Sequence, residues 1–152
     1  MQSVKLRIEK CDIQDIQDVQ EIENVSFNEP YPYSVFLDLL RQCPQAFLVA
    51  KEGKRVVGYC VCARAERPDT IILASIAVHP SFRRTGIGRK LLVEVIDKVR
   101  HEIPKIKRLT LQVRTDNYAA IKLYEGMGFD AAVVIRDYYG NGKDGIEMTL
   151  DL

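Results

Sequence analysis

The sequence feature that most constrains the fold is the nearly unbroken apolar run Ile71–Val78, which Pro80 ends. A strand with one solvent-exposed face alternates apolar and polar residues. A run without such alternation therefore predicts a strand that is covered on both faces. Two arginines and two glycines follow the run, and then a helix with apolar residues at helical spacing, namely Leu91, Leu92, Val95, Ile96 and Val99. We therefore expect a buried strand, a short loop and an amphipathic helix in succession.

The rest of the chain predicts further elements on both sides of this segment. Asp12 and Ser34 are expected to cap two helices, and a third helix is expected over Asn117–Met127, with Gly128 as its terminator. Alternation of apolar and polar residues predicts a strand at Val4–Glu9 with one buried face. Five more strands are predicted at Ala46–Ala50, Val56–Ala65, Leu109–Val113, Ala131–Tyr138 and Ile146–Leu150. Strands and helices do not alternate strictly, so the order predicts an α+β fold with a mixed sheet and not a doubly wound one.

Length and composition narrow the class of protein. A chain of 152 residues fits one domain, here residues 1–152, and 47% hydrophobic with 28% charged residues is typical of a globular fold. The formal net charge of +1 argues against a nucleic-acid-coating protein. The start of the chain lacks an apolar signal core, and no stretch approaches the ~18 apolar residues of a membrane span. We expect a cytoplasmic protein with neither a membrane nor a nucleic acid as partner.

The cysteines point away from metal chemistry. Cys11, Cys43, Cys60 and Cys62 form no CxxC pair, and the two histidines, His79 and His101, complete no zinc spacing. We expect buried free thiols in a reducing compartment, and no metal.

The most informative segment for chemistry is the loop after the apolar run. Gly86 and Gly88 let the backbone approach a ligand closely, and the helix that begins there points unpaired N–H groups outward. With Arg83, Arg84 and Arg89 the loop makes an anion cradle suited to a pyrophosphate. The plainer alternative is a tight turn with solvated arginines. The segment is neither a Walker loop nor a GxGxxG motif.

These residues resemble a known family. Residues 83–88 match R-x-x-G-x-G of the GNAT superfamily of acyl-CoA-dependent N-acetyltransferases, and residues 117–129 are similar to its N-x-x-A-x-x-L-Y-x-x-x-G-F motif. Residues 136–139, followed by Asp144 and Met148, resemble the tail of ribosomal-protein N-terminal acetyltransferases. Residues 29–33, which read Glu-Pro-Tyr-Pro-Tyr, are similar to the first loop of archaeal N-terminal acetyltransferases.

The resemblance implies a fold and an activity. It implies a GNAT fold: a mixed, mostly antiparallel central sheet of about seven strands, flanked by four helices, with splayed central strands. The implied activity is direct transfer of acetyl from acetyl-CoA to a primary amine in a ternary complex. The most similar members act on protein N-terminal α-amines, so protein or peptide N-termini are the expected partners.

The resemblance also implies site residues. Those expected to bind acetyl-CoA are Ile76, Ala77, Val78, Arg83, Arg84, Thr85, Gly86, Ile87, Gly88, Arg89, Asn117 and Tyr124. Tyr124 is also the implied general acid for the departing thiolate, with a packing role in the core as the plainer alternative. Those expected to line the peptide groove are Phe27, Glu29, Tyr31, Tyr138 and Tyr139.

One position departs from the family pattern. Many N-terminal acetyltransferases carry glutamate, a candidate general base, where this chain has Gln112. Glutamine orients a water or an amine but takes no proton at neutral pH. Glu29 is the next carboxylate that the resemblance offers as the base.

Two other functions stay open from sequence. The same fold acetylates small amines such as a polyamine or an amino sugar, although the loop at Glu29 holds only that one acid. A non-catalytic module that binds acyl-CoA is compatible with Gln112, whereas Tyr124 argues for catalysis. The preferred first residue, acetylation of lysines, ribosome association and homodimer formation are not decided by the sequence.

Overall fold

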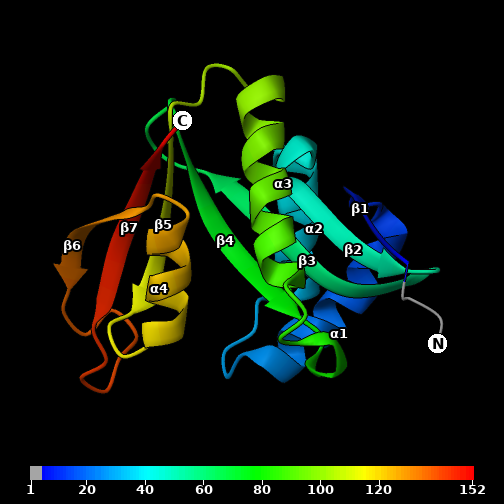
Figure 1. The fold of residues 1–152 in the computed structure, drawn as a ribbon, viewed down its shortest axis with the longest axis horizontal. Coiled ribbons are helices and arrows are strands. Elements are labelled where there is room, and N and C mark those ends of the chain that lie inside the picture. The colour runs from blue at the N-terminus through cyan, green and yellow to red at the C-terminus, as the bar shows by residue number, and fades with distance from the viewer. Residues whose placement is uncertain (1–4) are drawn as a thin grey trace. The chain divides into compact units, whose positions relative to one another are not determined.

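The computed structural model describes residues 5–152, which form four α-helices and seven strands (Figure 1). The strands are β1 (Leu6–Lys10), β2 (Phe47–Glu52), β3 (Arg55–Arg64), β4 (Thr70–Val78), β5 (Arg108–Arg114), β6 (Asp130–Ile135) and β7 (Gly145–Asp151). The helices are α1 (Ile16–Ser26), α2 (Tyr33–Gln42), α3 (Ile87–Glu102) and α4 (Tyr118–Gly126). Short 3-10 turns lie at Ile13–Asp15, Pro44–Ala46 and Pro80–Phe82.

The strands are hydrogen-bonded in the order β1-β2-β3-β4-β5-β7-β6. The pairs β1–β2, β2–β3, β5–β7 and β6–β7 are antiparallel, whereas β4 and β5 run parallel over Thr70–Ile72. The expected mixed, mostly antiparallel sheet is therefore confirmed. Splaying of the central strands stays a prediction.

The chain divides into two compact units. The first unit contains the chain as far as Arg64 together with Ala74–Pro104, and the second contains Ala65–Leu73 together with Lys105–Leu152. Strand β4 contributes residues to both units. The expectation of a single domain over residues 1–152 stays a prediction.

In the first unit, β2 and β3 are covered on both faces. Alternate residues such as Phe47, Val49 and Tyr59 belong to the core beneath α1 and α2. On the other face, the buried residues of α3 (Ile87, Leu91, Leu92, Val95 and Val99) approach β3 closely. A Cβ added at Gly58 would lie only 3.2 Å from Cδ1 of Leu91, so this glycine permits the close approach. Figure 1 shows α3 in front of these strands and α1 with α2 behind them.

In the second unit, β5 and β7 contribute alternate apolar residues to the core. Leu109, Leu111 and Val113 of β5 are buried, as are Met148 and Leu150 of β7. Helix α4 ends at Gly126, and Gly128 adopts φ 99° just beyond it, as expected for a helix terminator.

The structure corrects two predicted boundaries. Ser34 does not cap α2, because that helix begins at Tyr33 and its N-cap is Pro32. The last-but-one strand ends at Ile135 and does not reach Tyr138. The chain turns there because Asp137 adopts φ 54° and its carboxylate Oδ1 accepts a hydrogen bond from the Gly142 N–H at 2.6 Å.

Other boundaries agree with the sequence. Asp12 caps the 3-10 turn that leads into α1, where its side chain and that of Asp15 form a capping box. The apolar run Ile71–Val78 is β4, which begins one residue earlier, at Thr70. The predicted first strand begins at Val4, which lies outside the described residues. Over residues 5–152, no helix combines the length and apolarity that a membrane crossing requires.

Candidate active site

The segment between β4 and α3 presents an uncapped helix N-terminus. Gly86 is the N-cap of α3, with φ 82°, and no side chain caps the first turn. A Cβ added at Gly86 would meet no atom within 4 Å, so the backbone there is open to a ligand. Unpaired N–H groups and the positive end of the helix dipole favour an anion at this place. The loop is thus suited to an anionic group, and binding of a pyrophosphate there stays a prediction.

The three arginines of this segment differ in their contacts. Arg83 donates from Nε to the Val78 carbonyl at 2.9 Å and from Nη2 to Ser26 Oγ at 3.1 Å, so it fastens the loop to the ends of β4 and α1. Arg84, at φ 64°, and Arg89 are exposed at the helix N-terminus. The sequence did not separate the fastening arginine from the other two.

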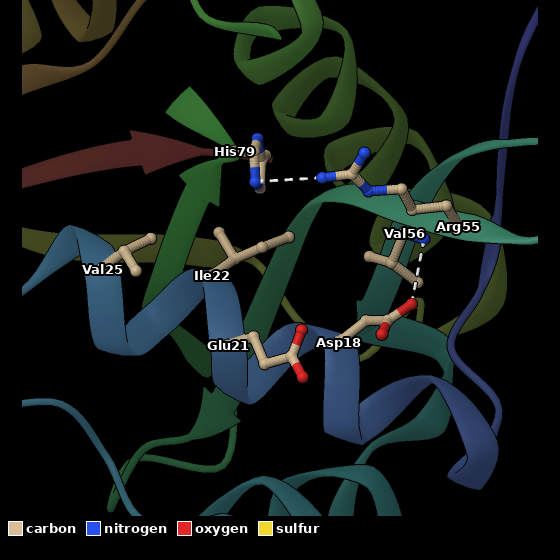
Figure 2. Close-up of a pocket in the computed structure, with 7 residues that line it drawn as sticks. All are labelled: Asp18, Glu21, Ile22, Val25, Arg55, Val56 and His79. Carbon is tan, nitrogen blue, oxygen red and sulfur yellow. Dashed lines mark hydrogen bonds between the residues drawn. The ribbon is translucent and has the colours of Figure 1, made fainter. Parts of the chain in front are cut away.

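A pocket of about 200 Å³ lies on the first unit between α1 and the ends of β3 and β4. Figure 2 shows Arg55 and His79 pointing toward one another, with Asp18 and Glu21 reaching in from α1. Arg55 Nη2 lies 3.1 Å from His79 Nε2, and His79 Nδ1 accepts from the Ser81 N–H at 3.1 Å. His79 therefore organises the turn at Pro80–Phe82.

The α1–α2 loop, residues 27–32, carries three of the predicted substrate contacts. Phe27 is the C-cap of α1, and Glu29 and Tyr31 are exposed. The Tyr31 ring stands edge-on to Phe36, with ring centroids 6.1 Å apart. The backbone of Tyr31 is held on both sides, since its N–H donates to Glu23 Oε2 at 2.9 Å and its carbonyl accepts from Gln20 Nε2 at 2.8 Å.

Sequence reasoning missed Glu23, a carboxylate buried in the first unit. Its side chain is hydrogen-bonded by the Tyr59 hydroxyl and by Ser75 Oγ, the latter at 2.7 Å. A signal was present, because Glu23 lies seven residues after Ile16 and four after Val19, on the buried stripe of α1. A charged residue at such a position needs polar partners in the core.

The second unit holds Gln112 in a polar groove of about 330 Å³ on β4, β5 and β7. Gln112 stands directly opposite Glu147 in the antiparallel β5–β7 register, and both line the groove. Directly opposed residues share one face of the sheet. Glu147 is thus a carboxylate beside Gln112, which sequence reasoning missed because the pairing of β5 with β7 was not known.

The other predicted residues of the second unit are placed as follows. Tyr124 is 8% exposed, and its ring centroid lies 5.7 Å from that of Phe129. Asn117 caps α4, since its Oδ1 accepts from the Ala120 N–H at 3.2 Å. Tyr138 and Tyr139 are exposed in the turn between β6 and β7, edge-on to each other at 4.9 Å. The predicted site residues thus belong to both units.

All four cysteines are buried free thiols, and the environment of Cys11, Cys60 and Cys62 is unsuited to nucleophilic chemistry. Burial, with the carboxylates of Asp15 and Asp12 nearby, raises the pKa of Cys11 to about 12. Burial also raises the pKa of Cys60 and of Cys62. A thiol with a raised pKa is rarely a thiolate at neutral pH, so it is a weak nucleophile. Within residues 5–152, no three His, Cys, Asp or Glu side chains gather in a way that could hold a metal ion.

The family profile, the related sequences and the solved structures all point to the same family. The profile of the Acetyltransferase (GNAT) family matches residues 13–129. A protein of Sulfurisphaera tokodaii named N-alpha-acetyltransferase is 32% identical over 96% of this chain and 93% of its own. A Mycobacterium tuberculosis protein named N-alpha-acetyltransferase RimI is 34% identical over 82% of this chain and 77% of its own. Among solved structures, a chain of the NatC complex bound to Gag peptide and CoA superposes with a TM-score of 0.88 and 27% identity, covering 97% of this chain and 99% of that one.

The uncapped α3 N-terminus generates a first prediction. Gly86→Val places a side chain where the backbone amides face the ligand, and it should weaken acetyl-CoA binding by at least about 2 kcal/mol, or about 30-fold in Kd. Isothermal titration calorimetry measures the change. Gly53→Val is the matched control, because Gly53 also has positive φ, 61°, but lies in the β2–β3 hairpin. Unchanged affinity in a folded Gly86→Val protein would mean that the pyrophosphate binds elsewhere.

Proposed function

Because the chain belongs to the Acetyltransferase (GNAT) family, and is an acetyl-CoA-dependent N-acetyltransferase, we propose that it acetylates the N-terminal α-amine of proteins. The observation that carries the proposal is the similarity, along almost the whole chain, to a protein named N-alpha-acetyltransferase. The exposed aromatic rings of Tyr31, Tyr138 and Tyr139 support it, since tyrosine hydroxyls suit the backbone groups of a peptide.

We assign donor binding to two segments of the first unit. The amides from Arg84 to Arg89 hold the pyrophosphate, and the backbone of Ile76–Val78 hydrogen-bonds the pantetheine arm. Asn117, whose side-chain oxygen caps α4, is assigned to the pantetheine or the nucleotide end of the same donor. When bound, acetyl-CoA supplies the thioester whose acyl carbon accepts the amine.

We assign proton transfer to two side chains. Glu29, through a water, takes the proton that the amine nitrogen loses as its bond to the acyl carbon forms, and Gln112 orients that water or the amine. Tyr124 gives its hydroxyl proton to the sulfur as the carbon–sulfur bond breaks. Backbone N–H groups of β4 stabilise the charge on the carbonyl oxygen. Atoms and protons balance, because one proton leaves the amine and one reaches the thiol.

A substrate comparison tests the proposed function. An α-amine with pKa 7.7–8.0 is roughly 10–17% neutral at pH 7, whereas a lysine near 10.4 is neutral to about 0.04%. Without a strong base, the enzyme should prefer a free N-terminus over an internal lysine by roughly two and a half orders of magnitude in kcat/KM. Mass spectrometry measures the acetylation of three substrates. They are a peptide with a free N-terminus, an N-terminally blocked peptide with one lysine, and spermidine. Preferential acetylation of spermidine would replace the proposal with small-amine acetylation.

The acid role of Tyr124 gives a second test. Tyr124→Phe keeps the ring against Phe129 and removes the proton, so the single-turnover acetylation rate should fall about 10²-fold while acetyl-CoA affinity stays the same. Tyr118→Phe on the same helix is the control, because Tyr118 is 73% exposed. A wild-type rate in Tyr124→Phe would leave Tyr124 as a packing residue only.

The base role of Glu29 gives a third test. Glu29→Gln should lower kcat/KM for an N-terminal peptide about 10-fold at pH 7, and raising the pH should recover part of the loss, because more amine is then already neutral. Gln112→Glu should raise activity on lysine peptides more than on α-amines. Glu94→Gln, an exposed glutamate on α3, is the control. If Glu29→Gln equals wild type from pH 6 to 9, the base is another group, and Glu147 beside Gln112 is then the carboxylate to substitute.

A further inference from the structure

We propose that Glu23 is a positioning residue that fastens the α1–α2 loop, residues 27–32, to the strands of the first unit, so that the loop is held ready for the peptide substrate. The proposal rests on the proposed function for the identity of that substrate. Glu23 is 2% exposed, so it acts from within the core and not by touching the peptide.

The two carboxylate oxygens of Glu23 have different partners. Oε1 accepts from the Tyr59 hydroxyl of β3 and from Ser75 Oγ of β4, and those two hydroxyl oxygens lie 3.1 Å apart. Oε2 accepts from the backbone N–H of Tyr31 in the loop, at 2.9 Å. One side chain thus joins two strands to the loop. All of these residues belong to the first unit.

Tyr31 is the point of the loop where such a bond is most effective. It lies between Pro30 and Pro32, which have no N–H, so within this tripeptide the Tyr31 N–H is the sole backbone donor. Gln20 holds the carbonyl of the same residue at 2.8 Å. Both backbone groups of Tyr31 are therefore bound by side chains of α1, which fixes the loop two residues after Glu29.

Aromatic contacts also connect the loop to Tyr59. The Tyr31 ring stands edge-on to Phe36, and Phe36 stands edge-on to Tyr59 with centroids 5.8 Å apart. Burial, with Glu23 beside it, raises the pKa of Tyr59, so its hydroxyl remains protonated and continues to donate. The loop is thus connected to Tyr59 by two routes, one through rings and one through Glu23.

Packing alone does not account for a carboxylate here. All three partners of Glu23 donate, as a group that only accepts requires. Within residues 5–152, no lysine, arginine or histidine forms an ion pair with it. A buried charge without a counter-cation costs free energy that an apolar residue would not, so its hydrogen bonds to the loop and the strands are the feature that explains it.

The strand side of the contact matters for the reaction. Ser75 directly precedes Ile76–Val78, the β4 segment assigned to the pantetheine arm. The same carboxylate therefore holds the substrate loop from one oxygen and the donor-binding strand from the other. We infer that Glu23 sets the position of Phe27, Glu29 and Tyr31 relative to that strand.

Amide exchange tests the contact without relying on activity. Glu23→Gln would not serve, because the hydroxyls of Tyr59 and Ser75 can accept from the amide nitrogen while the amide oxygen still accepts from the Tyr31 N–H. Glu23→Met keeps the approximate length of the side chain and removes both acceptor oxygens, so the Tyr31 N–H loses its partner. We expect hydrogen exchange of the Tyr31 amide, followed by NMR in the full chain, to accelerate at least about 10-fold. Asp15→Asn is the matched control: Asp15 is also a buried acid of the first unit, but it pairs with Lys51 at 2.9 Å and has no contact with the loop.

Kinetics then separate positioning from general stability. Glu23→Met should raise KM for an N-terminal peptide about fivefold or more, with kcat and the acetyl-CoA Kd changed less than about twofold. The strand side is expected to persist because the Tyr59 and Ser75 hydroxyl oxygens lie 3.1 Å apart, so one of them can then donate to the other. Asp15→Asn should leave the peptide KM, kcat and the acetyl-CoA Kd unchanged, even where it lowers the melting temperature. Gln20→Ala frees the Tyr31 carbonyl and also removes the bond from Gln20 to Asn24 Oδ1 within α1. It should raise peptide KM in the same direction, and it serves if Glu23→Met does not fold.

Three results would overturn the proposal. They are wild-type exchange of the Tyr31 amide in Glu23→Met, equal acceleration in Asp15→Asn, and accelerated exchange with unchanged peptide KM. If Glu23→Met does not fold, wild-type peptide KM in Gln20→Ala overturns it. If the wild-type protein acetylates no α-amine peptide, the proposed function fails, and the exchange data still decide whether Glu23 holds the loop.

Discussion

The first unit depends on the burial of β2 and β3 on both faces. Strands whose residues are apolar on both sides must be covered twice, and here α1 with α2 covers one face while α3 covers the other. Helix α3 comes close because Gly58 has no side chain opposite Leu91 and Ile87. The same packing holds α3 so that its uncapped first turn, at Gly86, remains open to a ligand. The open end of the helix, to which we assign the donor, is thus a consequence of how its apolar stripe packs.

Polar groups inside this unit connect the packed core to the α1–α2 loop. The α1 helix buries Ile16, Val19 and Ile22, and Glu23 follows on the same side with hydroxyl donors from β3 and β4. A buried carboxylate is stable only when such donors are positioned to meet it. Because one of its oxygens is left for the Tyr31 N–H, the rigidity of the core extends into a loop that has no regular structure of its own.

In the second unit, the register of β5 against β7 decides which polar side chains lie side by side. On β5, Leu109, Leu111 and Val113 face the core, so Thr110 and Gln112 necessarily face the other side of the sheet. The antiparallel pairing with β7 then sets Glu147 opposite Gln112 in a polar groove. A shift of the register by one residue would turn Glu147 toward the core, so the pairing itself decides which carboxylate stands beside Gln112.

The sequence by itself determined what depends on neighbours along the chain. The apolar run became β4, the helical spacing became α3, and Gly86 and Gly128 took the positive φ that their positions required. Element boundaries that depend on loop contacts were harder to predict, as at the start of α2 after Pro32 and at the turn at Asp137 that follows β6. Only the tertiary structure decided that Glu23 meets Tyr59 and Ser75, which lie 36 and 52 residues away, and that Gln112 meets Glu147. Periodicity shows which face of an element is buried, but it carries no information about which distant residue will lie against it.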